Sequence, residues 1–121
     1  MHYIGIDIIE IARIEQAIAR WGENFMQRVY TEPELKLYHQ KLSSLAARFA
    51  GKEAVTKALG FPTKGISWRE IEILSDPSGK PLVHLHGKAQ VQADRLSLAH
   101  LAISLSHSRE YAIALVTGEA K

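Results

Sequence analysis

The run from Leu45 to Gly60 constrains the fold of this chain more than any other stretch of its sequence. Its alanines, leucines, glutamate and lysines predict a helix, and Gly60 followed by Pro62 predicts where that helix ends. Small residues replace the large apolar stripe of an ordinary core helix, and Gly51 lies near the middle, although glycine costs a helix about 1 kcal/mol relative to alanine. We therefore expect something to approach this helix closely.

A strand is predicted near the N-terminus. Residues 3–9 alternate with period two and are rich in β-branched side chains, which is the pattern of a strand. The side chains expected to face the core are the isoleucines Ile4, Ile6 and Ile8. Asp7 is then expected on the opposite face, where Gly5 leaves room beside it. An aspartate is unfavourable in a strand, so its presence needs a reason.

Further helices are predicted between this strand and the central helix. Apolar residues recur at helical spacing over 10–21, and residues 24–30 have the composition of a short helix or turn. Thr31 followed three residues later by Glu34 is the capping-box signature, which predicts a helix that runs to about residue 41. A serine at position 43 or 44 is then expected to cap the central helix.

The second half of the chain predicts two antiparallel hairpins with a short helix between them. On the first of these strands, Ile71 and Ile73 are expected inward, and Glu70 and Glu72 outward. The predicted elements are strands 68–75 and 82–85, a helix over 88–96, and strands 101–106 and 111–117. With the N-terminal half, they predict a single α+β domain over residues 1–121, in which a mainly antiparallel sheet packs against helices.

Composition excludes several classes of protein. The 121 residues contain no cysteine, which excludes disulfides and thiolate chemistry and suits a reducing cytosol. No apolar run is long enough to span a membrane, and the N-terminus lacks the pattern of a secretion signal. The pI near 9.0 suits nucleic acid, an anionic membrane or an acidic protein, and charge alone does not choose among them. Nucleic acid is disfavoured because the net charge is only +2 and no aromatic platform interleaves with the basic residues.

Asp7 and Glu53 are the candidate metal ligands, because each carboxylate lies beside small residues. Two carboxylates that converge repel each other unless a cation joins them, and Mg²⁺ favours one or two carboxylates together with waters and substrate phosphates. Lys57, one helical turn after Glu53, could then reach a phosphate oxygen. The alternative is structural: Asp7 caps a loop, and Glu53 pairs with Lys57 on a solvated helix face.

Other polar residues are candidates for binding a ligand or a partner. His107 follows the strand at 101–106 and lies at a hairpin tip, where the alternative is a histidine that is merely exposed. Arg13 and Arg20 are seven residues apart on the first helix and form a basic stripe suited to an acidic helix, the alternative being a solvated face. Further candidates of the same kind are Arg28 and Arg48.

Three blocks of sequence occur in an order that is characteristic of one family. The blocks are Gly5–Glu10, Arg48–Gly60 and Ile103–Ser108, with the turn Gly79–Pro81 between the last two. They resemble holo-acyl-carrier-protein synthase, the small bacterial type of 4′-phosphopantetheinyl transferase. The resemblance covers nearly the whole chain, and the run F-x-x-K-E-x-x-x-K with an upstream G-x-D is specific.

The resemblance implies a reaction and a set of site residues. Enzymes of this kind transfer the 4′-phosphopantetheine group from coenzyme A to a serine of apo-acyl carrier protein with Mg²⁺, and they release adenosine 3′,5′-bisphosphate. By motif position, Asp7 and Glu53 would bind the metal, Glu53 or a metal-bound water would accept the serine proton, and Lys57 would hold the diphosphate. Contacts to the nucleotide portion of coenzyme A are implied for Arg48, Lys64, Ser106 and His107.

The resemblance also implies a homotrimer with active sites between subunits, acting in the cytoplasm in fatty acid biosynthesis. Clearance for coenzyme A and a neighbouring subunit would then explain the small residues of the central helix. An acidic carrier protein would dock on basic residues of the first helices, namely Arg13, Arg20 and Arg28. Larger members of the superfamily carry a further acid where this chain has Ile9, so two protein carboxylates are expected on the metal.

Two alternatives to this function stay open at the level of sequence. The first is a non-catalytic basic module that binds an acidic protein partner, with Asp7 and Glu53 purely structural. The second is another Mg²⁺-dependent phosphotransferase that acts on a different acceptor.

Overall fold

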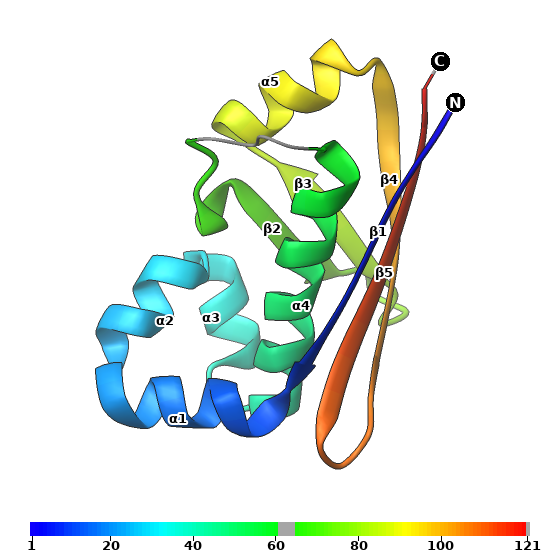
Figure 1. The fold of residues 1–121 in the computed structure, drawn as a ribbon. Coiled ribbons are helices and arrows are strands. Elements are labelled where there is room, and N and C mark those ends of the chain that lie inside the picture. The colour runs from blue at the N-terminus through cyan, green and yellow to red at the C-terminus, as the bar shows by residue number, and fades with distance from the viewer. Residues whose placement is uncertain (61–64, 121) are drawn as a thin grey trace.

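A long helix lies at the centre of the fold. The computed structural model describes residues 1–60 and 65–120. Helix α4 (Leu42–Leu59) packs against a three-stranded antiparallel sheet with strand order β1–β5–β4, as Figure 1 shows. The strands of that sheet are β1 (His2–Glu10), β4 (Leu98–His107) and β5 (Tyr111–Ala120). A smaller antiparallel sheet pairs β2 (Ile71–Ser75) with β3 (Pro81–Leu85).

The remaining helices complete an α+β architecture, which confirms the predicted fold class. They are α1 (Ile11–Trp21), α2 (Glu23–Val29), α3 (Glu32–Tyr38), the short 3₁₀ turn η1 (Trp68–Glu70) and α5 (Gly87–Arg95). Figure 1 shows α1, α2 and α3 grouped beside one end of α4, and α5 near the other end. Over residues 1–60 and 65–120, no helix combines the length and the apolar character needed to cross a membrane.

Strand β1 faces the opposite way from the prediction. Its isoleucines are exposed rather than buried, at 62% for Ile4, 52% for Ile6 and 59% for Ile8. The face that packs on α4 carries Gly5 and Asp7 instead, because a Cβ atom at Gly5 would overlap the carbonyl oxygen of Ala54. Only a glycine lets the strand approach the helix this closely, so the glycine-bearing face is the inner one. Asp7 therefore points toward α4.

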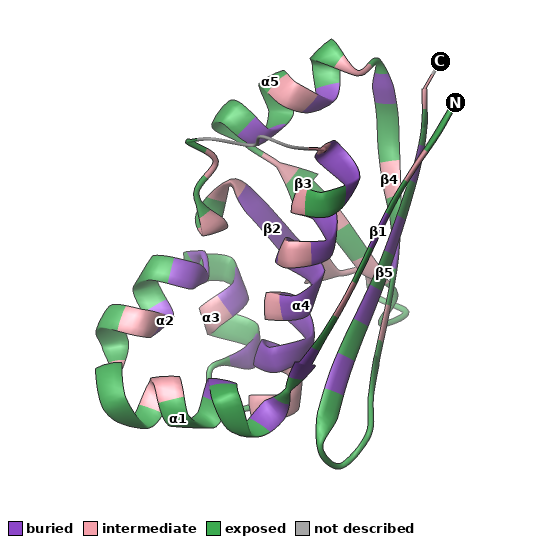
Figure 2. Ribbon diagram, in the orientation of Figure 1, coloured by how far each residue is buried: buried purple, intermediate pink, exposed green. Residues whose placement is uncertain are grey.

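The small residues of α4 lie against the chain's own strands. Ala50, Ala54 and Ala58 are buried, and Figure 2 shows most of α4 in the buried class. A Cβ atom at Gly51 would meet the side chains of Ile73 and Ile103. The expectation of a close approach is thus confirmed. The further expectation, that these positions give clearance to a ligand or a neighbouring subunit, is wrong at Ala50, Gly51 and Ala54, where the chain itself fills the space.

Several element boundaries differ from the prediction. The capping box of Thr31 and Glu34 is confirmed, but α3 ends at Tyr38. Helix α4 begins at Leu42 after Lys41, so the expected serine cap is wrong, and Lys41 provides no side-chain cap.

The first predicted strand of the second half also differs from the structure. It begins at Ile71, after the η1 turn, rather than at residue 68. Glu72 is buried instead of outward, because the Thr31 hydroxyl donates a hydrogen bond to its carboxylate at 2.6 Å.

Candidate active site

The site begins where β1 runs beside α4. The Nζ atom of Lys57 donates a hydrogen bond to Oδ1 of Asp7 at 3.1 Å and another to the carbonyl oxygen of Ile6 at 2.9 Å. The Asp7 side chain is 18% exposed and the Lys57 side chain 44%, so the pair opens to solvent at the ammonium end. Lys57 thus pairs with the aspartate of a strand, whereas the structural alternative paired it with Glu53.

Glu53 lies close enough to both residues to respond to their charges. Burial raises the pKa of the Glu53 carboxyl, the negative charge of Asp7 raises this pKa further, and the Lys57 ammonium partly offsets the rise. The structure therefore brings Asp7, Glu53 and Lys57 together, although they are far apart in the sequence. The two carboxylates repel each other, and the positive charge of Lys57 offsets only part of this repulsion.

This donor set fits a magnesium ion. Mg²⁺ prefers oxygen ligands, commonly takes one or two carboxylates, and completes its shell with waters and substrate phosphates. Among residues 1–60 and 65–120, no group of three or more histidine, aspartate or glutamate side chains is arranged to hold a metal by itself. The residues present suit an ion that is shared with a phosphate-bearing substrate better than one enclosed by protein ligands.

A depression of about 200 Å³ lies beside Glu53. Its lining combines polar and apolar side chains from α4 and from the segment that leads into β2: Glu53, Thr56, Ile66, Ser67, Trp68 and Ile71. The wall opposite α4 belongs to η1 and the residues next to it. A small ligand group can therefore enter next to the Glu53 carboxylate.

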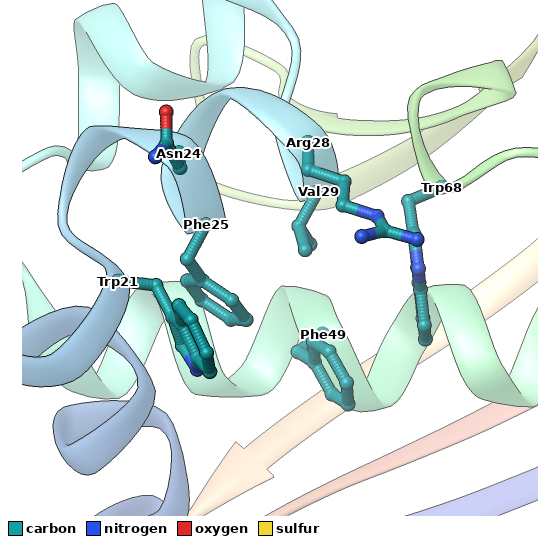
Figure 3. A pocket seen from close by; sticks show the side chains of 7 residues that line it. All are labelled: Trp21, Asn24, Phe25, Arg28, Val29, Phe49 and Trp68. Atoms are coloured by element: carbon teal, nitrogen blue, oxygen red, sulfur yellow. The ribbon is translucent and has the colours of Figure 1, made fainter.

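A second, larger pocket of about 380 Å³ is rich in aromatic side chains. Figure 3 shows the seven residues that line it: Trp21, Asn24, Phe25, Arg28, Val29, Phe49 and Trp68. The rings of Phe49 and Trp68 stack with their centroids 4.7 Å apart, and Arg28 extends toward Trp68. Because Trp68 also lines the depression beside Glu53, it separates the two pockets.

Two of the predicted basic residues, Arg20 and Arg28, lie beside this aromatic pocket. Arg13, Arg20 and Arg28 are all exposed. The Arg20 guanidinium lies 4.9 Å from the centroid of the Trp21 ring, and Trp21 and Arg28 both line the aromatic pocket. Helices α1 and α2 thus present basic groups next to an apolar hollow.

The residues predicted to bind the nucleotide are not gathered at the carboxylates. Arg48 is buried and donates hydrogen bonds to the carbonyl oxygen of Ile73 at 3.2 Å and to the Ser75 hydroxyl at 3.0 Å. Its guanidinium lies over the ring of Tyr38, 3.7 Å from the centroid. The donors of Arg48 are therefore engaged inside the chain. Lys64 lies outside the described residues.

Ser106 and His107 end strand β4 and are both exposed. Strand β5 separates them from Asp7, since β1 pairs with β5 and β5 pairs with β4. Asp7 lies opposite Ala114, whereas His107 lies opposite Ala112. Within one subunit, the structure leaves these residues apart from the carboxylates.

One charged residue was overlooked by the sequence analysis. Lys52 is fully buried and pairs with Glu34, which is also fully buried, at 2.8 Å. The signal was its spacing, because Lys52 lies seven residues after Leu45 and seven before Leu59, on the buried face of α4. A lysine on that face must carry its charge into the core.

Known proteins resemble the whole chain. Residues 3–116 match the family model described as the 4′-phosphopantetheinyl transferase superfamily. A holo-[acyl-carrier-protein] synthase of Dehalococcoides mccartyi is 55% identical, covering 98% of this chain and 99% of its own. One from Herpetosiphon aurantiacus is 51% identical, covering 94% of this chain and 95% of its own.

Solved structures agree with these matches. The holo-[acyl-carrier-protein] synthase of Helicobacter pylori, in complex with coenzyme A, superposes with a TM-score of 0.86 at 38% identity, covering 96% of this chain and 99% of that one. The Bacillus anthracis synthase, in complex with CoA (3′,5′-ADP), superposes with a TM-score of 0.79 at 34% identity, covering 98% of this chain and 96% of that one.

Proposed function

The chain belongs to the 4′-phosphopantetheinyl transferase superfamily, as an enzyme of the holo-[acyl-carrier-protein] synthase type, and from this premise we propose its reaction. It transfers the 4′-phosphopantetheine group of coenzyme A to a serine hydroxyl of apo-acyl carrier protein and releases adenosine 3′,5′-bisphosphate. The observation that carries this proposal is the convergence of Asp7, Glu53 and Lys57 at one place. The alternative of a non-catalytic basic module gives no reason for that convergence.

Each group of the site has a role in this reaction. Asp7 and Glu53 would hold Mg²⁺, which neutralises charge on the diphosphate of coenzyme A. Lys57 has a flexible, partly exposed side chain, so its ammonium can turn from Asp7 to the diphosphate and stabilise the leaving group. Glu53, or a water that it orients, accepts the serine proton as the new oxygen–phosphorus bond forms and the bond to the departing nucleotide breaks. Burial and the charge of Asp7 raise the pKa of Glu53, whereas bound Mg²⁺ would lower it.

The site is completed between subunits of a homotrimer. The outer face of the sheet supports this part of the proposal, because it carries exposed apolar side chains that a single subunit leaves uncovered: Ile4, Ile6, Ile8, Tyr111, Ile113 and Leu115. The separation of His107 from Asp7 within one subunit also supports it. In the trimer, Ser106 and His107 of one subunit bind the nucleotide portion of coenzyme A beside the carboxylates of another, with Lys64 as a further contact.

The acyl carrier protein docks on α1 and α2. Acidic groups of the carrier pair with Arg13, Arg20 and Arg28, all of which are exposed. The aromatic pocket next to Arg28 offers room for an apolar side chain of the same partner. Transfer takes place in the cytoplasm and serves fatty acid biosynthesis.

Mass spectrometry tests the reaction directly. Apo-acyl carrier protein is incubated with the chain, coenzyme A and Mg²⁺, and we expect the carrier to gain the mass of one phosphopantetheine group. The gain should disappear when a chelator removes the metal and return when excess Mg²⁺ is added. A carrier that keeps its apo mass in the complete mixture would refute the proposed transfer.

A further inference from the structure

The wall of the depression that faces α4 is built around a short turn. This wall consists of Ser67, Trp68 and Ile71, in and around the three-residue turn η1. A turn this short contributes little stability of its own, so its position depends on contacts with the rest of the chain. Trp68 stacks on Phe49 of α4, and side chains also bond to the backbone of the turn. Two charged residues make such bonds from opposite sides.

Lys52 holds the wall from the protein interior. Its ammonium group donates to the carbonyl oxygen of Trp68 at 3.2 Å and to that of Ile71 at 2.5 Å. The third donor goes to Oε1 of Glu34 at 2.8 Å, so the three donors of the ammonium group are all used. The backbone carbonyl of Lys52 also accepts a hydrogen bond at 2.9 Å from Thr56, which lines the same depression.

Glu70 holds the wall from the outer side. Its Oε1 atom accepts a hydrogen bond from the backbone N–H of Ser67 at 2.9 Å. The Oε2 atom accepts from the backbone N–H groups of Lys88 and Ala89, in the first turn of α5. One carboxylate therefore ties η1 to α5, while Lys52 ties the same turn to α4 and, through Glu34, to α3.

These contacts have a consequence for the reaction. We propose that Lys52 and Glu70 are positioning residues, which fix the Ser67–Ile71 wall at the distance from Glu53 that the transfer step needs. The inference rests on the proposed function, because the depression matters only if Glu53 takes part in the chemistry. Neither Lys52 nor Glu70 lines the depression itself. Loss of either one should therefore lower kcat far more than it raises the KM for coenzyme A.

Two variants and two matched controls test this inference. K52M removes the ammonium group at nearly constant volume, and E70Q removes the carboxylate charge at the surface. V116A is the control for lost stability, since Val116 is buried in β5 within the sheet. D94N is the control for charge, since Asp94 is an exposed acid on α5. The readouts are the melting temperature, kcat, the KM for coenzyme A, and Trp68 fluorescence in a W21F background, where Trp68 is the only tryptophan.

We expect kcat to fall at least tenfold in both variants, with less than a threefold change in KM and a red shift of Trp68 emission. The controls should keep kcat and emission close to those of the parent protein. Folded K52M and E70Q proteins with parental kcat and emission would overturn the inference, and so would an equal loss of kcat in V116A. If K52M does not fold, E70Q decides the outcome alone.

A failure of the proposed function would look different. In that case the parent protein itself transfers no phosphopantetheine, whereas Trp68 emission still reports whether Lys52 and Glu70 hold the wall. Unchanged emission in a folded variant would then refute the inference independently of activity.

Discussion

At the scale of single residues, Asp7 and Lys57 change the chemistry of Glu53. Burial and the charge of Asp7 raise the pKa of Glu53, and Lys57 offsets part of that rise. The Lys57 ammonium already bonds to Asp7, so it shields one carboxylate more than the other. A divalent cation would relieve the remaining repulsion and would lower the pKa of Glu53. Glu53 is therefore the residue whose charge the reaction should need most.

The variant E53Q removes this charge and keeps the shape of the side chain. We expect the rate of holo-carrier formation to fall by at least about 100-fold, a size typical of losing one group that stabilises charge in a transition state. Circular dichroism should be unchanged, because Glu53 makes no buried ion pair among the described residues. E32Q, on an exposed position of α3, is the matched control and should keep the parental rate. Equal rates for E53Q and E32Q would contradict the role assigned to Glu53.

At the scale of elements, two glycines lie where strands pack closely on α4: Gly5 of β1 lies against α4, and Gly51 of α4 lies against β2 and β4. A Cβ atom at Gly5 would overlap the backbone carbonyl of Ala54, which cannot move without bending the helix. A Cβ atom at Gly51 would meet the ends of flexible side chains, chiefly Ile73. The first glycine is therefore required by backbone contact, and the second is not.

The variants G5A and G51A should differ in stability for this reason. We expect G5A to lower the free energy of unfolding by about 1–3 kcal/mol, the usual range for overpacking a core. G51A should be close to neutral, since a gain of about 1 kcal/mol in helix propensity offsets the local crowding. Urea unfolding followed by circular dichroism measures both changes. A G5A protein as stable as G51A would show that the contact with Ala54 is easily relaxed.

The proposed docking of an acidic carrier protein assigns its electrostatic part to the exposed arginines of helix α1. The variant R13A removes one exposed charge and should raise the KM for the acyl carrier protein about fivefold, while the KM for coenzyme A stays near its parental value. Added salt should raise the carrier KM of the parent protein more than that of R13A, because screening weakens charge pairing. K36A, an exposed lysine on α3, is the control. A carrier KM that does not respond to salt would argue against docking by charge.

The buried carboxylate of Glu72 links α3 to the smaller sheet. Burial raises its pKa, but hydrogen bonds from Thr31 and His86 outweigh that effect, so the pKa of Glu72 lies below its usual value. A carboxylate with a lowered pKa in the folded state stabilises the protein above its unfolded pKa of about 4.3 and loses this contribution as the pH falls through its folded value.

The variant E72Q should therefore be less stable than the parent protein at pH 7. The difference in unfolding free energy should shrink as the pH falls below about 4.3, since the parent carboxylate then becomes protonated too. Urea unfolding at a series of pH values measures this difference. If the two proteins differ by the same amount at pH 7 and at pH 3, the charge of Glu72 makes no contribution of its own to stability.

At the scale of the whole molecule, periodicity and capping signals predicted the order of the elements. They did not predict which face of β1 is buried. Alternation identified a strand over residues 3–9, yet it could not tell which face is buried, because that depends on what packs against it. The isoleucines favoured one face on hydrophobicity alone. The contact of Gly5 with α4 decided for the other face, and no rule based on β1 by itself contains that contact.

In the candidate site, too, relations between neighbouring residues were predictable from the sequence, whereas contacts between residues far apart in it were not. Glu53 and Lys57 were predictable from one helical turn, and the motif placed Asp7 with them. The structure then paired Lys57 with Asp7, which is fifty residues away in the sequence. The buried Lys52–Glu34 pair depends on how α3 and α4 meet, so spacing could mark Lys52 as buried without naming its partner.

The orientation of β1 leads to a prediction about assembly. The variant I6E places a charge in the middle of the exposed apolar face of the sheet. If three subunits associate through this face, burying the charge would be costly, and the variant should elute as a monomer of about 13.5 kDa where the parent protein elutes at three times that mass. Size-exclusion chromatography with light scattering gives both masses.

Leu37 provides a matched control, because it is 51% exposed on α3 and Ile6 is 52% exposed on the sheet. L37E should keep the parental mass and activity, whereas I6E should lose transfer activity together with its partners, since His107 of a neighbouring subunit would no longer reach the carboxylates.

Mixing E53Q and H107A subunits extends this test, because a mixed trimer then contains some sites with both residues intact. Recovery of activity on mixing requires shared sites, and a fully active I6E monomer would rule them out.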